Sequence, residues 1–332
     1  MKELWCRLRR RIRIRRASRD TIIGPKDPSF LHSFIPSFLS DHTRQVIVTK
    51  TIDLHIHTTA SDGTVSPAAV VRCAKELGLS AVAITDHDTV SGCAEAAAAG
   101  QELGLEVVPG VELSSRYGKT IHILGYFVRT NSPALTRVLS GVVAERDARN
   151  RKMAALMAAD GIPIDYDQMC SRFGTSIGRP HFGEVLVELG RAESVQDAFD
   201  RYIEKGQPYY LPRRMISIER SVEVIREAGG VPVLAHPFQY KLEEPALRQL
   251  IEHCMDHGLL GLECRYSLYD EEQSQYLLKL AREYGLVPTG GSDFHGSNKP
   301  HIAIGTGTGS LAVPAAWLEG LRAVATSTKK RS

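Results

Sequence analysis

The stretch Asp53-Leu54-His55-Ile56-His57-Thr58-Thr59-Ala60-Ser61-Asp62-Gly63 follows an apolar, β-prone lead and ends in a turn-forming Ser-Asp-Gly. Side chains two residues apart on a strand point to the same face, so His55 and His57 predict two imidazoles that share one cation. Asp62 lies on the turn and can curl back towards a neighbouring metal. A lone H-x-H pair is a weak signal, so the prediction depends on what the rest of the chain adds.

The composition is that of an ordinary globular protein, with 43% hydrophobic and 24% charged residues among 332. The chain has no run of about 18 apolar residues, so we expect no membrane span. Its six cysteines form no C-x-x-C pair. This scatter favours a reducing compartment, and we expect a cytoplasmic protein.

The positive charge is concentrated at the start of the chain. Nine Lys/Arg and one Glu within residues 1–19 give +8, so the other 313 residues carry −5 of the net +3. Such an arm could contact RNA or an anionic membrane surface, or act in targeting, or be a disordered extension or a misplaced start codon. We expect residues 1–48 to be a basic, disordered extension. His32, Ser33 and Pro36 interrupt the apolar stretch that follows the arm, which argues against a secretory signal.

Strand and helix patterns alternate on both sides of a long helical segment. Before it, apolar strands near residues 51, 82 and 108 are separated by helices over 67–77 and 91–103. After it, strands near 233, 261 and 288 are separated by helices over 245–257 and 270–284. This alternation predicts an α/β fold with mostly parallel strands. We predict an α/β body over 49–132 and 221–325 and a helical insertion over 133–220.

One connection predicts a hairpin instead of a helix. Residues 116–119 have the character of a turn between strands over 111–114 and 120–126. A turn centred near Tyr117 would place Glu112 opposite His122 or Ile123. Cross-strand neighbours lie about 5 Å apart, so Glu112 and His122 could hold one ion between them.

Residues of the metal-ligand type recur at or just past the predicted strand ends. They are His55, His57, Asp62, His87, Glu112, His122, His236, Asp293 and His295. Taken singly, His236 could be a turn residue, Asp293 a helix cap and His122 a satisfied core histidine. Taken together, half of the 12 histidines fall at strand ends, where barrel-like α/β folds build their active sites. Nine ligands are too many for one metal and suit two or three.

The charge balance of such a site indicates its chemistry. Three divalent cations against three carboxylates leave a positive pocket, which favours an anionic substrate. Clustered metals stabilise both oxygens of a displacement at phosphorus and lower the pKa of a bound water to about 7. We therefore predict hydrolysis of a phosphate ester by metal-bound hydroxide, with no separate side-chain nucleophile.

Several motifs resemble those of one known family. Thr85-Asp86-His87-Asp88, Gly110-Val111-Glu112, Ala235-His236-Pro237 and Gly291-Ser292-Asp293-Phe294-His295-Gly296 are similar to motifs of the polymerase and histidinol phosphatase (PHP) superfamily. Gly178-Arg179-Pro180-His181, in the insertion, resembles the subgroup with nucleoside 3′,5′-bisphosphate phosphatases and 5′-to-3′ exoribonucleases. The resemblance covers about residues 50–305.

This resemblance implies a distorted (β/α)7 barrel with an α-helical insertion. It also implies two or three divalent metal ions, usually manganese, with magnesium, zinc or iron(II) as alternatives. The first implied site consists of His55, His57, Glu112 and Asp293. Glu112 bridges to a second site completed by His122 and His236. The third site consists of Asp62, His87 and His295.

The resemblance also indicates substrate contacts. Arg179 and His181 would reach from the insertion to a phosphate, because the planar arginine fork matches phosphate oxygens. Arg179 could instead be a surface residue beside a helix-starting proline, and Lys299 is a weaker phosphate candidate. We interpret three further carboxylates as groups that orient imidazoles. They are Asp53, Asp86 and Asp88.

The expected substrate is a phosphate monoester of a nucleotide, such as adenosine 3′,5′-bisphosphate, 5′-AMP or the 5′ end of a short RNA. No obligate protein partner is expected. A histidinol-phosphate phosphatase is one alternative, although so small a substrate needs no covering insertion. A non-catalytic nucleic-acid-binding, polymerase-accessory module is another, although an intact ligand set disfavours it.

Overall fold

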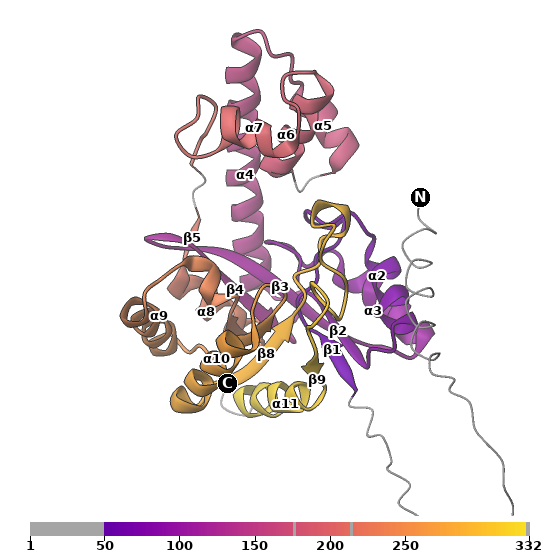
Figure 1. Cartoon of the computed structure of the whole chain (residues 1–332), viewed down its shortest axis with the longest axis vertical. Coiled ribbons are helices and arrows are strands. Elements are labelled where there is room, and N and C mark those ends of the chain that lie inside the picture. The colour runs from indigo at the N-terminus through magenta and orange to yellow at the C-terminus, as the bar shows by residue number, and fades with distance from the viewer. Residues whose placement is uncertain (1–49, 175–176, 213–214, 330–332) are drawn as a thin grey trace, which may run out of the picture. The chain divides into compact units, whose positions relative to one another are not determined.

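A computed structural model describes residues 50–174, 177–212 and 215–329, so the predicted extension over 1–48 lies outside the described residues. In the described part, one sheet has the order β8-β7-β6-β4-β3-β2-β1-β9, and β5 pairs with β3 (Figure 1). The strands are β1 (Thr51–Asp53), β2 (Ala81–Ile84), β3 (Glu106–Tyr117), β4 (Lys119–Tyr126), β5 (Ile216–Ser217), β6 (Val231–Leu234), β7 (Gly261–Tyr266), β8 (Val287–Gly291) and β9 (Val313–Pro314).

The sheet curves into a nearly closed barrel because β1 and β8 approach each other. Beyond β1, the Leu54 amide donates to the Gly290 carbonyl at 3.2 Å, and the Asp293 amide donates to the His55 carbonyl at 2.8 Å. Gly291 makes this approach possible, since a Cβ there would lie 2.3 Å from the His55 nitrogen. The antiparallel pairs β3–β4 and β4–β6 interrupt the parallel strands of the barrel, and β9 pairs antiparallel with β1 at one edge of the sheet. The predicted α/β fold and its seven strands are confirmed.

Helices cover the outside of the sheet (Figure 1). They are α2 (Pro67–Glu76), α3 (Cys93–Leu103), α8 (Ile218–Glu227), α9 (Glu244–Asp256), α10 (Glu271–Tyr284) and α11 (Ala316–Lys329), with 3-10 turns η3 (Pro237–Tyr240) and η4 (Gly296–Asn298). Apolar residues at helical spacing, such as Val222 and Ile225 of α8, are fully buried against strand residues such as Ile123. Each fully buried side chain of this kind stabilises the fold by roughly 1.5–3 kcal/mol.

The segment between β4 and β5 is helical in its described residues. It contains α4 (Pro133–Ala159), α5 (Tyr166–Phe173), α6 (Arg179–Glu188), α7 (Val195–Ala198) and the π-helical turn η2 (Phe199–Ile203). Its shorter helices gather around the C-terminal half of α4 (Figure 1). A separate apolar cluster, which includes Met153, Phe182 and Ile203, holds them together. The predicted boundaries of an insertion at 133–220 stay a prediction.

The β3–β4 hairpin exists, but its predicted register is wrong. Glu112 pairs with Leu124, and His122 pairs with Ser114, two residues further along. The turn is centred on Gly118, whose φ of +67° reverses the chain between Tyr117 and Lys119. Glu112 and His122 are therefore diagonal neighbours on one face of the ladder, still within reach of each other.

Two short strands and the helix α11 had no prediction, and α8 extends beyond the range predicted for the insertion. β5 and β9 have two residues each and carry no period-2 pattern. α8 begins at Ile218, inside the range predicted for the insertion, and α11 follows the last predicted strand. Within the described residues, no helix is both long and apolar enough to cross a membrane.

Candidate metal centre

The nine predicted ligand residues meet at the carboxyl-end side of the barrel strands. His55 and His57 lie just past β1, His87 just past β2, and His236 just past β6. Glu112 and His122 lie within β3 and β4, and Asp293 and His295 follow β8. Asp62 joins them from the turn that follows His57. Residues spread over some 240 positions thus form one cluster of polar side chains, as the sequence predicts.

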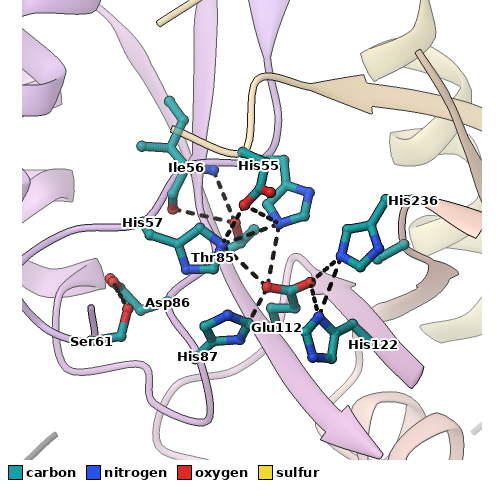
Figure 2. A network of polar contacts seen from close by, with 12 residues as sticks. His55, Ile56, His57, Ser61, Thr85, Asp86, His87, Glu112, His122 and His236 are labelled. Atoms are coloured by element: carbon teal, nitrogen blue, oxygen red, sulfur yellow. Dashed lines mark hydrogen bonds and ion pairs between the residues drawn. The ribbon is translucent and has the colours of Figure 1, made fainter. Parts of the chain in front are cut away.

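Glu112 lies at the centre of this cluster, and five imidazoles surround its carboxylate (Figure 2). Its Oε2 atom lies 3.3 Å from His55 Nε2, 3.2 Å from His57 Nε2 and 3.1 Å from His87 Nδ1. Its Oε1 atom lies 3.0 Å from both His122 Nδ1 and His236 Nε2. The two oxygens of Glu112 therefore face two different groups of imidazoles, as a bridging carboxylate would.

Two more carboxylates complete the cluster. Asp293 Oδ1 lies 3.3 Å from His57 Nε2 and 3.4 Å from His295 Nδ1. Asp62 Oδ1 lies 3.4 Å from His295 Nε2 and 3.7 Å from His57 Nδ1. The side chain of Asp62 is 27% exposed, whereas Asp293 and Glu112 are nearly inaccessible to solvent. The Asp62 end of the cluster therefore opens to solvent.

Unusual backbone conformations direct the side chains that follow the strands. Asp88, His236 and Asp293 have φ angles of +53°, +24° and +55°, and all three come just after a strand. Non-glycine residues rarely adopt positive φ, and such residues gather at functional sites. The reversal after β6 and β8 turns the chain so that His236 and Asp293 point into the cluster.

The spacing of the ring nitrogens fits divalent cations. His55 Nε2 lies 3.2 Å from His57 Nε2, and His122 Nδ1 lies 3.3 Å from His236 Nε2. Two imidazoles bound to one tetrahedral zinc at about 2.0–2.1 Å would hold their nitrogens about 3.4 Å apart. Four groups of three or four residues in the cluster have all their ligand atoms within 4.8 Å of one another. The donor set, imidazole and carboxylate, suits zinc, manganese or iron.

The charges of the cluster are strongly coupled. Burial by itself would raise the pKa of Glu112, but His87, His122 and His55 hold that pKa well below its usual range. Burial would lower the pKa of His57, but Asp293 and Glu112 raise it to about 9. Burial lowers the pKa of His87 to about 3. Without metal, positive charge on protonated imidazoles thus balances the negative charge of the buried carboxylates. A bound cation would replace these protons.

Asp53, Asp86 and Asp88 hold main chain and hydroxyl groups in the hydrogen bonds that the structure describes. Asp53 accepts from the amides of Ser292 and Gly305, which fixes the segment after β8. Asp86 accepts from the amide and hydroxyl of Thr58, and Asp88 accepts from the Ser114 amide. In these contacts the three aspartates fix the segments that carry the ligands, and the orientation of imidazoles by these aspartates stays a prediction.

Glu263 of β7, which the sequence analysis missed, contacts the His55 ring at the nitrogen that faces away from Glu112. Its Oε1 atom lies 2.9 Å from His55 Nδ1, and its Oε2 atom accepts from the His236 amide at 2.7 Å. Glu263 is completely buried. The signal was present, since Glu263 is the one charged residue of the apolar run Leu259 to Cys264. Charged side chains are rarely buried completely unless they are paired, so a lone Glu in a buried strand indicates a partner.

Of the predicted substrate residues, Arg179 and His181 lie in different surroundings. Arg179 donates to the Ile203 carbonyl, and its guanidinium lies 3.5 Å from Glu204 Oε1, so it packs against η2. His181 is buried, and its ring lies 4.9 Å from Phe173. Burial lowers the pKa of His181, and the negative charges of Glu184 and Asp62 oppose this shift. The Nδ1 atom of His181 accepts a hydrogen bond from the Gly178 amide at 2.9 Å, at the start of α6.

Lys299 contacts the cluster directly. Its Nζ atom lies 2.6 Å from Asp293 Oδ2, the same oxygen that accepts from the Tyr266 hydroxyl at 2.6 Å. The side chain of Lys299 is 34% exposed. Lys299 therefore stands at the rim of the site, with its ammonium beside a candidate metal ligand.

The hydroxyl and thiol groups described near or behind the site are poorly placed as nucleophiles. Ser61 and Thr58 both donate their hydroxyl hydrogens to Asp86, at 2.6 and 2.8 Å, and not to an imidazole base. Burial raises the pKa of the Cys93 thiol to about 11. These observations favour a water-derived nucleophile.

A nearly closed α/β barrel with histidines and carboxylates clustered at its strand ends defines a metal-dependent hydrolase. Comparison with known proteins gives the family. The PHP domain family matches residues 53–172. A 5′-3′ exoribonuclease of Haemophilus influenzae is 34% identical over 249 residues, which are 75% of this chain and 91% of that protein.

Two further relatives agree. A 3′,5′-nucleoside bisphosphate phosphatase of Chromobacterium violaceum is 34% identical over 248 residues, 74% of this chain and 87% of its own. A solved structure from Bifidobacterium adolescentis, described as a metal-dependent phosphoesterase, has a TM-score of 0.73 and 31% identity, and the match covers 82% of this chain and 96% of that one. The chain belongs to the PHP family. It is a metal-dependent phosphoesterase, and therefore a hydrolase, as the sequence predicts.

Proposed function

We propose that this chain hydrolyses phosphate monoesters of nucleotides, namely nucleoside 3′,5′-bisphosphates, 5′-AMP or the 5′ ends of short RNAs. The observation that carries the proposal is the overlap of the four ligand groups in the cluster. Four residues each belong to two of these groups, namely His55, His57, His87 and Glu112. Cations bound in overlapping groups are close neighbours, and neighbouring cations suit displacement at phosphorus. The names of the bacterial relatives support a nucleotide as the substrate.

The proposal includes an assignment of the ligands. His55, His57, Glu112 and Asp293 form one site, and Glu112 bridges to a second with His122 and His236. The group His55–His57–Asp293 supports the first site, and the 3.0 Å distances from Glu112 Oε1 to His122 Nδ1 and His236 Nε2 support the second. Asp62, His87 and His295 form a third site, supported by the group that adds His57 to them. Manganese is the proposed metal.

Bound metals would supply charge stabilisation for the phosphate and would lower the pKa of a coordinated water. The chain's own residues hold and orient the reacting groups. Glu263 fixes the ring of His55 and the backbone of His236. Lys299 at the rim of the site and His181 on α6 are the proposed hydrogen-bond donors to a phosphate. Arg179 would have to leave Glu204 to join them.

A cavity next to the cluster fits the rest of a nucleotide. It has a volume of about 650 Å³ and lies between α4 and the loop that follows β2, where Asp88, the neighbour of His87 in the chain, is part of its lining. Its lining mixes hydroxyls with apolar groups, among them Thr89, Ser140, Leu139 and Val143. Ligand pockets commonly have about 300–1,000 Å³. We place the nucleoside here, with residues 133–220 acting as a helical insertion that covers a barrel formed by 49–132 and 221–325.

The proposed location of this reaction is the cytoplasm. The described cysteines Cys73, Cys93, Cys170, Cys254 and Cys264 are free thiols, as expected in a reducing compartment.

The main experiment measures phosphate release by the manganese-loaded protein from adenosine 3′,5′-bisphosphate, 5′-AMP, a 5′-phosphorylated short RNA and histidinol phosphate. We expect turnover of at least one nucleotide substrate and much less of histidinol phosphate. His87→Ala should abolish turnover, whereas His301→Ala, an exposed histidine outside the cluster, serves as the control. Failure to release phosphate from every substrate would refute the proposal, and preference for histidinol phosphate would favour the alternative enzyme.

A second experiment tests the position of the nucleoside. Ala144 is exposed and lines the cavity, so Ala144→Trp would fill part of it without disturbing the core. We expect the KM for nucleotides to rise about tenfold or more, while turnover of p-nitrophenyl phosphate, which lacks a nucleoside, stays unchanged. Equal effects on both substrates would place the nucleoside elsewhere.

A further inference from the structure

A second group of candidate metal ligands lies on the outer helices, and it shares no residue with the cluster around Glu112. It consists of Glu219 of α8, His253 of α9 and His257 at the C-terminal end of α9. The ligand atoms of these three side chains all lie within 4.8 Å of one another. The side chains are about one-third exposed, so solvent ions can reach them.

The arrangement follows from the helical period. His253 and His257 are four residues apart and lie on one face of α9, and Glu219 and Glu223 lie in the same way on α8. His253 Nε2 is 2.5 Å from Glu219 Oε1, and His257 Nδ1 is 3.6 Å from Glu223 Oε1. Two carboxylates of one helix thus face two imidazoles of the next. Histidines at positions i and i+4 of a helix are a common way to chelate zinc.

The two helices are held rigidly in this relation. Ile218 and Val222 of α8, and Leu250 and Cys254 of α9, are buried in the same apolar core. The ring of Tyr117 lies 4.9 Å from that of His253 and restricts its orientation. The ligand atoms are therefore fixed by the fold and need little reorganisation to bind an ion, which favours affinity.

We propose that Glu219, His253 and His257 bind a zinc-class divalent cation, with Glu223 available as a fourth ligand. Two imidazoles and one or two carboxylates match the ligand types and the coordination number of zinc. Two carboxylates facing two neutral histidines leave a negative charge, and a dication compensates it. The bound ion joins α8 to α9 on the outside of the barrel. The alternative is that no metal binds and that His253 pairs with Glu219 and His257 with Glu223 as ion pairs.

The experiment counts zinc in the full-length protein after equilibrium dialysis against zinc chloride, by elemental analysis. We expect the wild-type chain to hold one zinc more than His253→Ala or His257→Ala. His301→Ala is the control for general loss of a surface histidine. Phosphoesterase turnover should be the same in all these variants, because the catalytic cluster is left intact. This result is independent of the proposed nucleotide substrate.

A further variant separates metal binding from hydrogen bonding. His253→Gln keeps a donor for Glu219 but replaces imidazole with an amide, a poor zinc ligand. We expect it to lose the extra zinc, and with it the part of the zinc-dependent rise in Tm that this ion supplies, while folding normally. Equal zinc content in the wild type and in all three variants would overturn the proposal and leave only ion pairs between the helices.

Discussion

At the scale of single residues, Glu112 explains why so many histidines can be buried together. An isolated buried carboxylate is costly, and so is an isolated buried imidazolium. Five imidazoles within 3.3 Å of the two Glu112 oxygens share this cost in the metal-free protein. The same atoms offer overlapping ligand sets for cations. The arrangement is thus suited to metal exchange without unfolding.

Glu263 gives the first prediction, because it holds two candidate ligands from behind. Glu263→Gln keeps the size of the side chain but loses the charge that fixes the His55 ring. Loss of such a partner commonly weakens metal binding about 10–100-fold. We expect the metal content of Glu263→Gln to fall at limiting manganese, with a Tm of the metal-free protein close to that of the wild type.

The matched control is Glu102→Gln, at an exposed position of α3. It should bind metal as the wild type does, in the same titration. Wild-type affinity in Glu263→Gln would show that the carboxylate serves the fold alone. A large loss of Tm without metal, with unchanged affinity, would lead to the same conclusion.

His57 gives a prediction about pH. In the metal-free protein its pKa is raised from 6.5 to about 9, because Asp293 and Glu112 outweigh the opposing effect of burial. Between pH 6.5 and 9 the ring is therefore protonated in the folded protein, and a metal must displace that proton. Manganese affinity should weaken as pH falls through this window. Calorimetric titration at pH 7.5 in buffers of different ionisation enthalpy should detect proton release, and identical heats in all buffers would contradict it.

At the scale of the elements, the strand ends were easier to predict than the strands themselves. His87, His236 and Asp293 each follow a short apolar run, and this local pattern located them correctly. Two-residue strands such as β5 and β9 carry no pattern of their own and exist only through their partners. The hairpin register was misplaced because it depends on the turn at Gly118, which the sequence of the strands does not specify.

Glu263 and the residues of α6 show that local sequence patterns do not predict contacts between segments that are far apart in the chain. A strand pattern cannot say which strand lies behind His55, because this depends on how the barrel closes. In the same way, the side of α6 that faces the cluster depends on packing between segments far apart in the sequence. Arg179 and His181 are two residues apart, yet one packs against η2 and the other packs against the ring of Phe173.

Barrel closure gives a prediction at this scale. In Gly291→Ala, the new Cβ would lie 2.3 Å from the His55 nitrogen and would push β8 away from β1. Overpacking of this kind costs about 1–3 kcal/mol. We expect a lower urea midpoint and weaker metal binding, since His55 and Asp293 flank the contact. Gly141→Ala, in an open position of α4, should raise stability by up to about 1 kcal/mol instead. Equal stability of the two variants would mean that the contact between β8 and His55 has space for the added methyl group.

At the scale of the whole molecule, bound metal ions would connect parts of the chain that are far apart in sequence. The candidate ligands come from the ends of β1, β2, β6 and β8 and from within β3 and β4. A ligand that binds only the folded state stabilises it by about 2.7 kcal/mol at a hundredfold excess over its dissociation constant. Removal of metal by a chelator should therefore lower the Tm of the entire barrel, and not only loosen the site.

Manganese titrated back into the chelated protein should raise Tm with the logarithm of its concentration. In Glu112→Gln, which removes the charge shared by both halves of the cluster, this rise should shrink strongly. His253→Ala should keep the full response to manganese, because the outer helices do not contribute to the cluster. A metal-free protein as stable as the metal-loaded one would show that the fold alone holds the nine side chains together and that the cations add no stability.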